Sequence, residues 1–229
     1  MGKVVIVEGI IGAGKTTFSK WLAEALDGTW LQEPDEQNGN PYLSKFYSDP
    51  TRWALTMQLH LLNTRFRMHQ HAQWTVMQSS KSVVLDRSYF GDTAFARLQL
   101  KNGTLSQDEF DTYAMCYQNM TASVLLPQFC VYLKTTPEVS QKRIANRMEH
   151  QTGRKCENVI DMGYLESLDI EEKAMVNTLS SQGVHIISLD WNEDLTEEQI
   201  KHKITEVSKT IQEYTVPDMF LDIHRRTVS

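Results

Sequence analysis

Short runs of β-branched and aromatic residues alternate along the chain with longer amphipathic stretches. The short runs predict five strands, at residues 4–8, 29–32, 82–85, 129–133 and 184–189. Apolar positions that recur every three or four residues predict helices at residues 16–26, 42–47, 50–78, 90–100, 107–125, 137–148, 164–181 and 196–213. Asp49 is a candidate N-cap for the long third helix, with Pro50 in its first turn. Strands alternating with helices favour an α/β fold with a five-stranded, parallel, doubly wound sheet, which binds ligands at the carboxyl ends of its strands.

Composition narrows the class of protein. Hydrophobic residues make up 41% of the 229 residues and charged residues 23%, which is typical of a globular chain, and we expect one domain over residues 1–229. The net charge of −6 argues against a nucleic-acid polymer as partner, and no apolar stretch is long enough to cross a membrane. Three cysteines without a C-x-x-C pair argue against a disulfide framework or zinc site. No signal peptide is visible, so we expect a cytoplasmic protein.

The first predicted strand leads into a phosphate-binding motif. Its residues read Gly9-Ile10-Ile11-Gly12-Ala13-Gly14-Lys15-Thr16, which is the G-x-x-x-x-G-K-[ST] pattern between a strand and a helix. The glycines let backbone N–H groups surround phosphates, Lys15 would reach the outer phosphates, and the Thr16 hydroxyl would bind Mg²⁺. A glycine turn that merely joins the two elements is the alternative. We therefore predict a nucleoside triphosphate site formed by residues 9–16 and the adjacent Thr17.

Charged residues follow the second and third predicted strands. Glu33 is placed to orient a hydroxyl nucleophile and accept its proton, although from position alone a solvated loop carboxylate is as good an interpretation. Asp86 could hold Mg²⁺ or its waters, and Arg87 could bind phosphate oxygens or clamp a carboxylate. An Asp–Arg pair that only closes a turn is the alternative there. Both positions fall at the sheet edge where the fold class places its ligands.

Three arginines mark a candidate lid at about residues 143–162. Arg143 and Arg147 are four residues apart and so share one helix face, and Arg154 follows in a stretch without helical periodicity. Such a basic segment suits a lid that closes over phosphates as charge shifts in the transition state. A solvated helix face is the alternative, and it is common for charges at this spacing.

Taken together, these motifs resemble the deoxynucleoside kinase family. The resemblance rests on residues 9–16, Glu33-Pro34, Tyr47, Gln58, Asp86-Arg87-Ser88 and the lid arginines, in the family's order from Met1 to about Asp190. It implies a P-loop kinase fold with an arginine-bearing lid, and transfer of the ATP γ-phosphate to the 5′-hydroxyl of a deoxynucleoside with Mg²⁺. It also implies nucleotide salvage, a homodimer, and catalytic roles for Lys15, Glu33 and Arg87.

The resemblance also assigns the substrate site. It makes Glu33 the general base, places Arg87 at the 5′ side of the substrate, and gives the 3′-hydroxyl to Tyr47 and Glu157. The base pocket that it implies consists of Met57, Gln58, Arg65, Asp92 and Phe95. The Arg65–Asp92 pair is similar to that of deoxycytidine and deoxypurine kinases, and the spacing from Asp86 to Asp92 looks most like bacterial-type deoxyadenosine and deoxyguanosine kinases. We expect a purine, with adenine ahead of guanine, and keep a deoxycytidine or broad-specificity kinase as the alternative.

The chain departs from the family pattern at three positions. Asn38 stands where animal members have Trp, and Ala96 stands where many relatives have an aromatic residue, so that Phe95 is the candidate for stacking. Glu149 replaces a lid arginine, and Arg154 is the candidate substitute.

Two other functional interpretations of the sequence compete with a nucleoside kinase. A thymidylate-type monophosphate kinase shares the P-loop, the Glu-Pro after the second strand and the Arg-bearing lid, although Tyr47, Gln58 and Asp92 favour a nucleoside kinase. A catalytically silent kinase-like subunit would be expected to lack Lys15, Glu33 or Arg87, and the chain has all three. Three histidines on the long helix, His60, His69 and His71, lack a metal-binding arrangement and are expected at the surface or in an interface.

Overall fold

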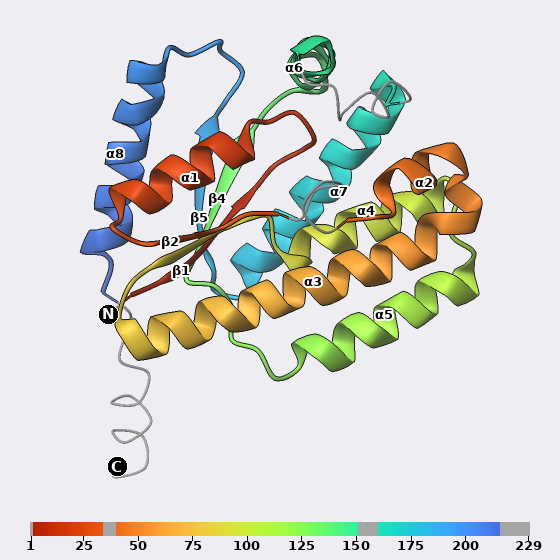
Figure 1. Cartoon of the computed structure of the whole chain (residues 1–229), viewed down its shortest axis with the longest axis horizontal. Helices are drawn as coiled ribbons and strands as arrows, with labels where there is room; N and C mark the ends of the chain where they lie inside the picture. The colour runs from red at the N-terminus through yellow and green to blue at the C-terminus, as the bar shows by residue number, and fades with distance from the viewer. Residues whose placement is uncertain (1, 34–39, 151–159, 216–229) are drawn as a thin grey trace.

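The computed structural model describes residues 2–33, 40–150 and 160–215, and its centre is a five-stranded sheet (Figure 1). The strand order is β2-β3-β1-β4-β5, and every neighbouring pair is parallel. The predicted α/β fold and strand count are confirmed, and each strand begins and ends within one residue of its predicted bounds. The strands are β1 (Val4–Glu8), β2 (Thr29–Leu31), β3 (Val83–Asp86), β4 (Phe129–Lys134) and β5 (His185–Asp190).

Eight helices are present in the described part of the chain, as the periodicity predicts. They are α1 (Lys15–Ala25), α2 (Leu43–Ser48), α3 (Pro50–Ser79), α4 (Tyr89–Lys101), α5 (Gln107–Thr121), α6 (Pro137–His150), α7 (Met162–Ser181) and α8 (Glu197–Glu213). The expected cap of α3 is confirmed, because the Asp49 carboxylate accepts a hydrogen bond from the Arg52 N–H at 3.2 Å. None of these helices is long and apolar enough to cross a membrane.

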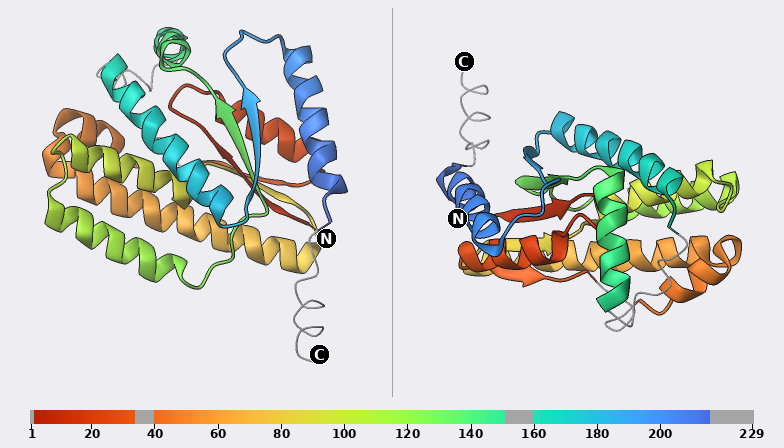
Figure 2. Two further views of the ribbon diagram at one scale, coloured as in Figure 1. Left: turned by 180° about the vertical axis from the view of Figure 1, so that it is seen from behind. Right: turned by 90° about the horizontal axis from the view of Figure 1, so that it is seen from above.

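Helices cover both faces of the sheet, so that the molecule has three layers (Figure 2). Successive side chains of β1 point to opposite faces. Val5 and Val7 pack with Phe18 of α1 and with the apolar side of α8. Val4 and Ile6 pack with α3, α4 and α7 on the other face. Because β1 is buried on both faces, the loop that follows it starts from a fixed position in the middle of the sheet.

Helix α5 ends at Thr121, four residues earlier than predicted. In a longer helix the carbonyl of Leu125 would point along the helix axis. Here it accepts a hydrogen bond from Gln73 Nε2 of α3 at 2.5 Å. His69 Nε2 lies 2.8 Å from the same oxygen. The connection from α5 to β4 therefore lies on α3, and a tertiary contact ends the helix.

His69 corrects a prediction. It was expected at the surface or in an interface, but its side chain is fully buried within the fold and its ring packs edge-on against Tyr89, with centroids 5.0 Å apart. Burial lowers the pKa of His69, and the Leu125 carbonyl can accept a hydrogen bond only from an Nε2 that carries the proton. A neutral imidazole protonated on Nε2 satisfies both conditions, so this residue has a structural role.

We expect His69→Ala to lower the free energy of unfolding by about 3 kcal/mol, because it removes both a buried ring and a buried hydrogen bond. His71→Ala is the matched control, since His71 is exposed two residues further along the same helix and should change stability by less than about 0.5 kcal/mol. Urea unfolding of both variants measures the difference. Equal stabilities would contradict the structural role of His69.

Candidate active site

The loop after β1 has the backbone of a phosphate-binding loop. Gly12 and Gly14 have φ values of 82° and 85°, which residues with a side chain rarely adopt. A Cβ on Gly12 would also lie only 2.8 Å from the Ser140 carbonyl oxygen. Gly14 is the N-cap of α1, so the first N–H groups of that helix join the loop N–H groups at one place. This local geometry follows directly from the glycine spacing in the sequence.

The Lys15 ammonium lies against the loop that carries it. Nζ donates hydrogen bonds to the carbonyl oxygens of Gly9 and Ile10, at 2.9 and 2.8 Å. Burial and the nearby Arg87 lower the pKa of Lys15 to about 8, although the surrounding carboxylates act in the opposite direction. At neutral pH the side chain remains mostly protonated, as binding to a polyphosphate requires.

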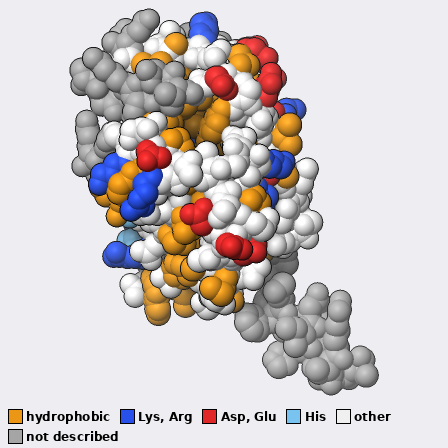
Figure 3. Space-filling view, turned by 90° about the vertical axis from the view of Figure 1, so that its right-hand side faces the viewer, with side chains coloured by type: hydrophobic (Ala, Val, Ile, Leu, Met, Phe, Trp, Pro, Cys, Tyr) orange, Lys and Arg blue, Asp and Glu red, His pale blue; other side chains and the backbone are white. Residues whose placement is uncertain are grey.

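A cleft of about 560 Å³ opens beside this loop and brings the predicted residues together. Figure 3 views the molecule from the side of α2, and hydrophobic side chains surround a hollow in that face. The predicted residues in the cleft lining are Ile11, Gly12, Gly14, Lys15, Thr16, Thr17, Glu33, Tyr47, Met57, Gln58, Arg65, Asp86, Arg87, Phe95, Arg143 and Arg147. Gly9, Ile10, Ala13 and Asp92 lie behind this lining and are buried.

Glu33 lies between two arginines. One oxygen accepts a hydrogen bond from Arg65 Nη2, and the other lies 3.5 Å from Arg87 Nε. Burial alone would raise the pKa of Glu33, but the charges of Arg65, Arg87 and Lys15 outweigh it and hold the pKa below its usual value. The carboxylate is 28% exposed, so it is ionised and still accessible from the cleft. A solvated loop carboxylate does not describe this environment.

Arg65 joins Glu33 to the predicted base pocket. Its Nη1 donates a hydrogen bond to Asp92, so one guanidinium bridges two carboxylates, and its side chain is only 3% exposed. Gln58 lies two helical turns before Arg65 on α3. Its side chain is fully buried, and neither its oxygen nor its nitrogen has a hydrogen-bond partner among the described residues. A buried amide without partners costs free energy unless a ligand supplies them. This end of the cleft therefore suits a flat polar group with donors and acceptors.

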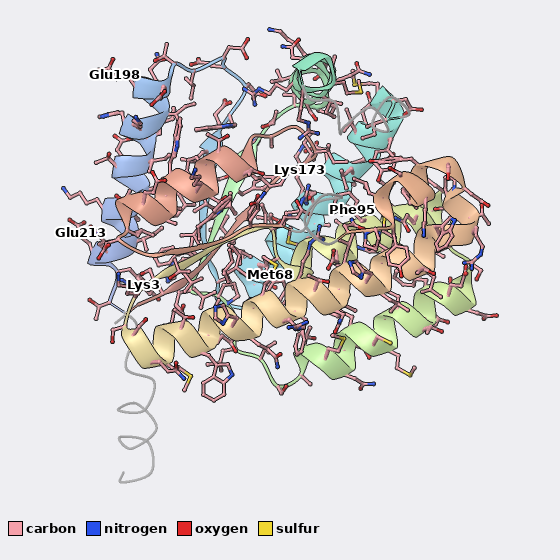
Figure 4. All side chains as sticks on the ribbon, in the orientation of Figure 1. Lys3, Met68, Phe95, Lys173, Glu198 and Glu213 are labelled. Carbon is pink, nitrogen blue, oxygen red and sulfur yellow. The ribbon has the colours of Figure 1, made fainter. Side chains whose placement is uncertain are left out.

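Aromatic and apolar side chains border the same end. Phe95 extends from α4 into the region between α2, α3 and α7 (Figure 4), and its ring centroid lies 4.9 Å from the Arg87 guanidinium carbon. Sequence reasoning missed several residues that line the cleft here: Gln32, Asn40, Leu43, Phe46, Leu61 and Tyr164. Phe46 and Leu61 follow the helical periodicity that also marks core residues. The sequence pattern does not distinguish an apolar side chain in a cleft wall from one in the core.

Asp86 and Thr16 provide oxygen atoms at the phosphate end. Burial and the charge of Glu33 raise the pKa of Asp86, and the Thr16 hydroxyl and Lys15 act in the opposite direction. Neither Asp86 oxygen has a hydrogen bond of normal geometry to a described residue. Mg²⁺ prefers such oxygen donors, usually one or two from the protein with phosphates and water completing its shell. These residues fit the predicted Mg²⁺ site, and a bound cation would keep Asp86 ionised.

The helix α6 carries the described lid arginines. Arg143 donates hydrogen bonds from Nη1 to the Trp191 carbonyl and from Nη2 to the Glu193 carbonyl, each at 2.9 Å. It is therefore fixed to the loop between β5 and α8 while it borders the cleft. Arg147 borders the cleft one turn further on. Arg154, Glu157 and Asn38 lie outside the described residues.

These features define a P-loop kinase fold, and comparison with known proteins gives the family. Residues 5–213 match the family described as deoxynucleoside kinase. The chain is 35% identical over 190 residues to the deoxyguanosine kinase of Dictyostelium discoideum, covering 83% of this chain and 64% of that protein. It is 30% identical over 204 residues to the deoxyadenosine kinase of the same organism, covering 89% of this chain and 78% of that protein. The chain therefore belongs to the deoxynucleoside kinase family, as the motifs predict.

Solved structures support the fold. A structure of deoxyadenosine kinase from M. mycoides with bound dATP has a TM-score of 0.74 to this chain and covers 90% of it and 98% of that chain, with 22% sequence identity. The family match decides against the thymidylate-type monophosphate kinase considered from the sequence.

Proposed function

We propose that the protein transfers the γ-phosphate of ATP to the 5′-hydroxyl of a purine deoxynucleoside, with deoxyadenosine preferred to deoxyguanosine. The observation that carries this proposal is the Glu33–Arg65–Asp92 chain, which joins an ionised carboxylate beside the P-loop to a pocket with the unpartnered Gln58 amide. A nucleoside is a substrate with both parts that this arrangement needs: a hydroxyl at one end and a flat base with donors and acceptors at the other.

In this mechanism the loop N–H groups and Lys15 hold the ATP phosphates. Glu33 accepts a hydrogen bond from the 5′-hydroxyl, orients it in line with the γ-phosphorus and takes its proton. Arg87, Arg143 and Arg147 offset the negative charge on the transferring group. Mg²⁺ bound near Thr16 and Asp86 would neutralise charge on the β- and γ-phosphates. Little covalent chemistry is required of the protein, so positioning and charge supply most of the rate.

The base preference follows from Gln58. A glutamine amide can donate to one base atom and accept from a neighbouring one, and adenine N7 and N6 match this pair, as in DNA recognition. The Arg65–Asp92 pair lies beside it and adds donors and an acceptor. Deoxyguanosine and deoxycytidine also present paired donors and acceptors, and the similar Dictyostelium proteins are named for both purines. Adenine is therefore proposed as the best, and not the exclusive, base.

The first experiment measures ATP-dependent phosphorylation of the four deoxynucleosides beside their four monophosphates. Faster turnover of deoxyadenosine than of the other seven compounds is the expected result. Preference for thymidine would contradict the proposed base pocket and leave the family unchanged. Turnover of monophosphates alone, or no turnover while ATP still binds, would contradict the proposed reaction.

Magnesium use gives a separate prediction. We expect Asp86→Asn to raise the Mg²⁺ concentration for half-maximal turnover by about 10-fold, because the amide keeps the shape but removes the charge that attracts the cation. Asp108→Asn is the control, since Asp108 is exposed on α5 away from the cleft. The measurement is turnover against free Mg²⁺ at fixed ATP. Identical titration curves for wild type and Asp86→Asn would contradict the assignment of Asp86.

The assembly proposed with this function is a homodimer in the cytoplasm, as the family resemblance implies. Light scattering of the purified protein measures the mass, and a monomer at micromolar concentration would contradict a stable dimer.

A further inference from the structure

Two buried carboxylates lie behind Arg87, on the side away from Glu33. Arg87 Nη1 donates a hydrogen bond of 3.0 Å to Glu172 Oε1 and lies 3.9 Å from Glu8 Oε2. Glu8 stands at the end of β1 and Glu172 in α7, and both side chains are fully buried. Neither carboxylate is among the described residues that line the cleft, so neither can touch a substrate bound there. The contacts that link them to the cleft are those with Arg87 and, for Glu8, with the neighbouring Ser88.

The backbone of Arg87 is in an unusual conformation. Its φ is 66°, in the left-handed region, which costs a residue with a side chain on the order of 1 kcal/mol or more. The next residue is held by Glu8, whose Oε1 accepts hydrogen bonds from the Ser88 N–H at 2.8 Å and from the Ser88 hydroxyl. Glu8 therefore fixes the turn that directs Arg87 into the cleft, while Glu172 holds the guanidinium itself.

The space around Glu8 leaves little freedom. A Cβ on Gly91, in the first turn of α4, would lie 2.8 Å from Glu8 Oε2, so a larger residue there would displace the carboxylate. Arg87 is surrounded by three carboxylates, Glu8, Glu33 and Glu172, although one suffices to balance its charge. Burying extra carboxylates is costly, and Oε2 of both Glu8 and Glu172 has no hydrogen-bond partner among the described residues. Stability alone does not account for this arrangement.

We propose that Glu8 and Glu172 are positioning residues for Arg87 in the phosphoryl-transfer step. Glu172 sets the direction of the guanidinium through the contact at Nη1, and Glu8 holds the left-handed turn through Ser88. With one side fixed in this way, Arg87 keeps its Nε near Glu33 and its remaining N–H groups for the transferring phosphate. The inference rests on the proposed function, because it acts through the role assigned there to Arg87.

The test compares two neighbouring glutamates in α7. We expect Glu172→Ala to lower kcat by about 10- to 100-fold, because a small displacement of a catalytic group has effects of this size, and to change KM for ATP and deoxyadenosine by less than about 3-fold. Glu172→Gln should recover most of kcat, because its amide oxygen still accepts from Arg87. Glu171→Ala is the matched control: Glu171 is also buried and ion-paired, but with Arg97 and Lys101. It should lose stability and keep kcat within about 2-fold.

Glu8→Ala should likewise lower kcat with little change in KM, and Glu8→Gln should recover most of kcat. Unchanged kcat in folded Glu172→Ala, or an equal loss of kcat in Glu171→Ala, would overturn the inference. If Glu172→Ala does not fold, Glu172→Asp replaces it. The shorter side chain keeps the charge but loses the 3.0 Å contact, and a kcat equal to wild type would again overturn the proposal. A wild-type protein that phosphorylates no deoxynucleoside would instead refute the proposed function, so the two failures are distinguishable.

Discussion

Glu33→Gln is expected to lower kcat by about 10²- to 10⁴-fold, the range typical of a lost general base, while KM for the deoxynucleoside changes little. Glutamine keeps the shape of the side chain and one oxygen that can accept from Arg65, but it cannot take up the proton of the 5′-hydroxyl. The residues proposed to bind the base and the phosphates lie elsewhere in the cleft and are unchanged in this variant. Steady-state kinetics with saturating ATP measure the change in each constant.

Glu24→Gln is the matched control for this substitution. Glu24 is exposed on α1, outside the cleft, and should leave both constants at their wild-type values. Turnover of Glu33→Gln within a few-fold of wild type would show that another group accepts the proton. An increase in KM at constant kcat would instead assign Glu33 to binding alone, which contradicts a role in the transition state.

The phosphate end of this site was predictable from the sequence, because its chemistry is local. Residues 9–16 are proposed to bind phosphates with their own backbone, and eight consecutive positions contain the glycine spacing that allows the loop. The parallel sheet followed from the alternation of strand and helix patterns. With β1 and β3 adjacent in that sheet, Gly9 and Asp86 had to lie at the same edge.

The contacts among the charged residues were not predictable in the same way. Arg65 was expected to read the base, and the structure adds its hydrogen bond to Glu33, which lies 32 residues away in the sequence. Glu172 is 85 residues from Arg87, and nothing in the periodicity of α7 separates it from Glu171. Glu8 did carry a signal, since a glutamate at the end of a fully buried strand requires a partner. The prediction that His69 lies at the surface or in an interface was wrong because the α5–β4 connection covers that part of α3, which a helix pattern does not reveal.

Arg65→Met is expected to change both the base preference and the pH dependence of turnover. Arg65 is one of the charges that hold the pKa of Glu33 below its usual value, and its removal leaves Glu33 and Asp92 without the cation between them. The pKa of Glu33 must then rise. Because Glu33 acts as general base only when its carboxylate is ionised, the acid limb of the profile of kcat/KM against pH should move to higher pH. The proposed preference for deoxyadenosine over the other deoxynucleosides should fall as well.

Two further variants make this prediction specific. Arg67→Met is the control, since Arg67 is exposed two residues further along α3 and should keep the wild-type profile. Removing one partner of a buried ion pair costs about 3–5 kcal/mol, so Arg65→Lys provides a milder change. Lysine keeps the charge and so should shift the acid limb less, but it lacks the planar fork that bridges two carboxylates and should still lose base selectivity. A wild-type acid limb and base preference in Arg65→Met would contradict the bridge between catalysis and base recognition.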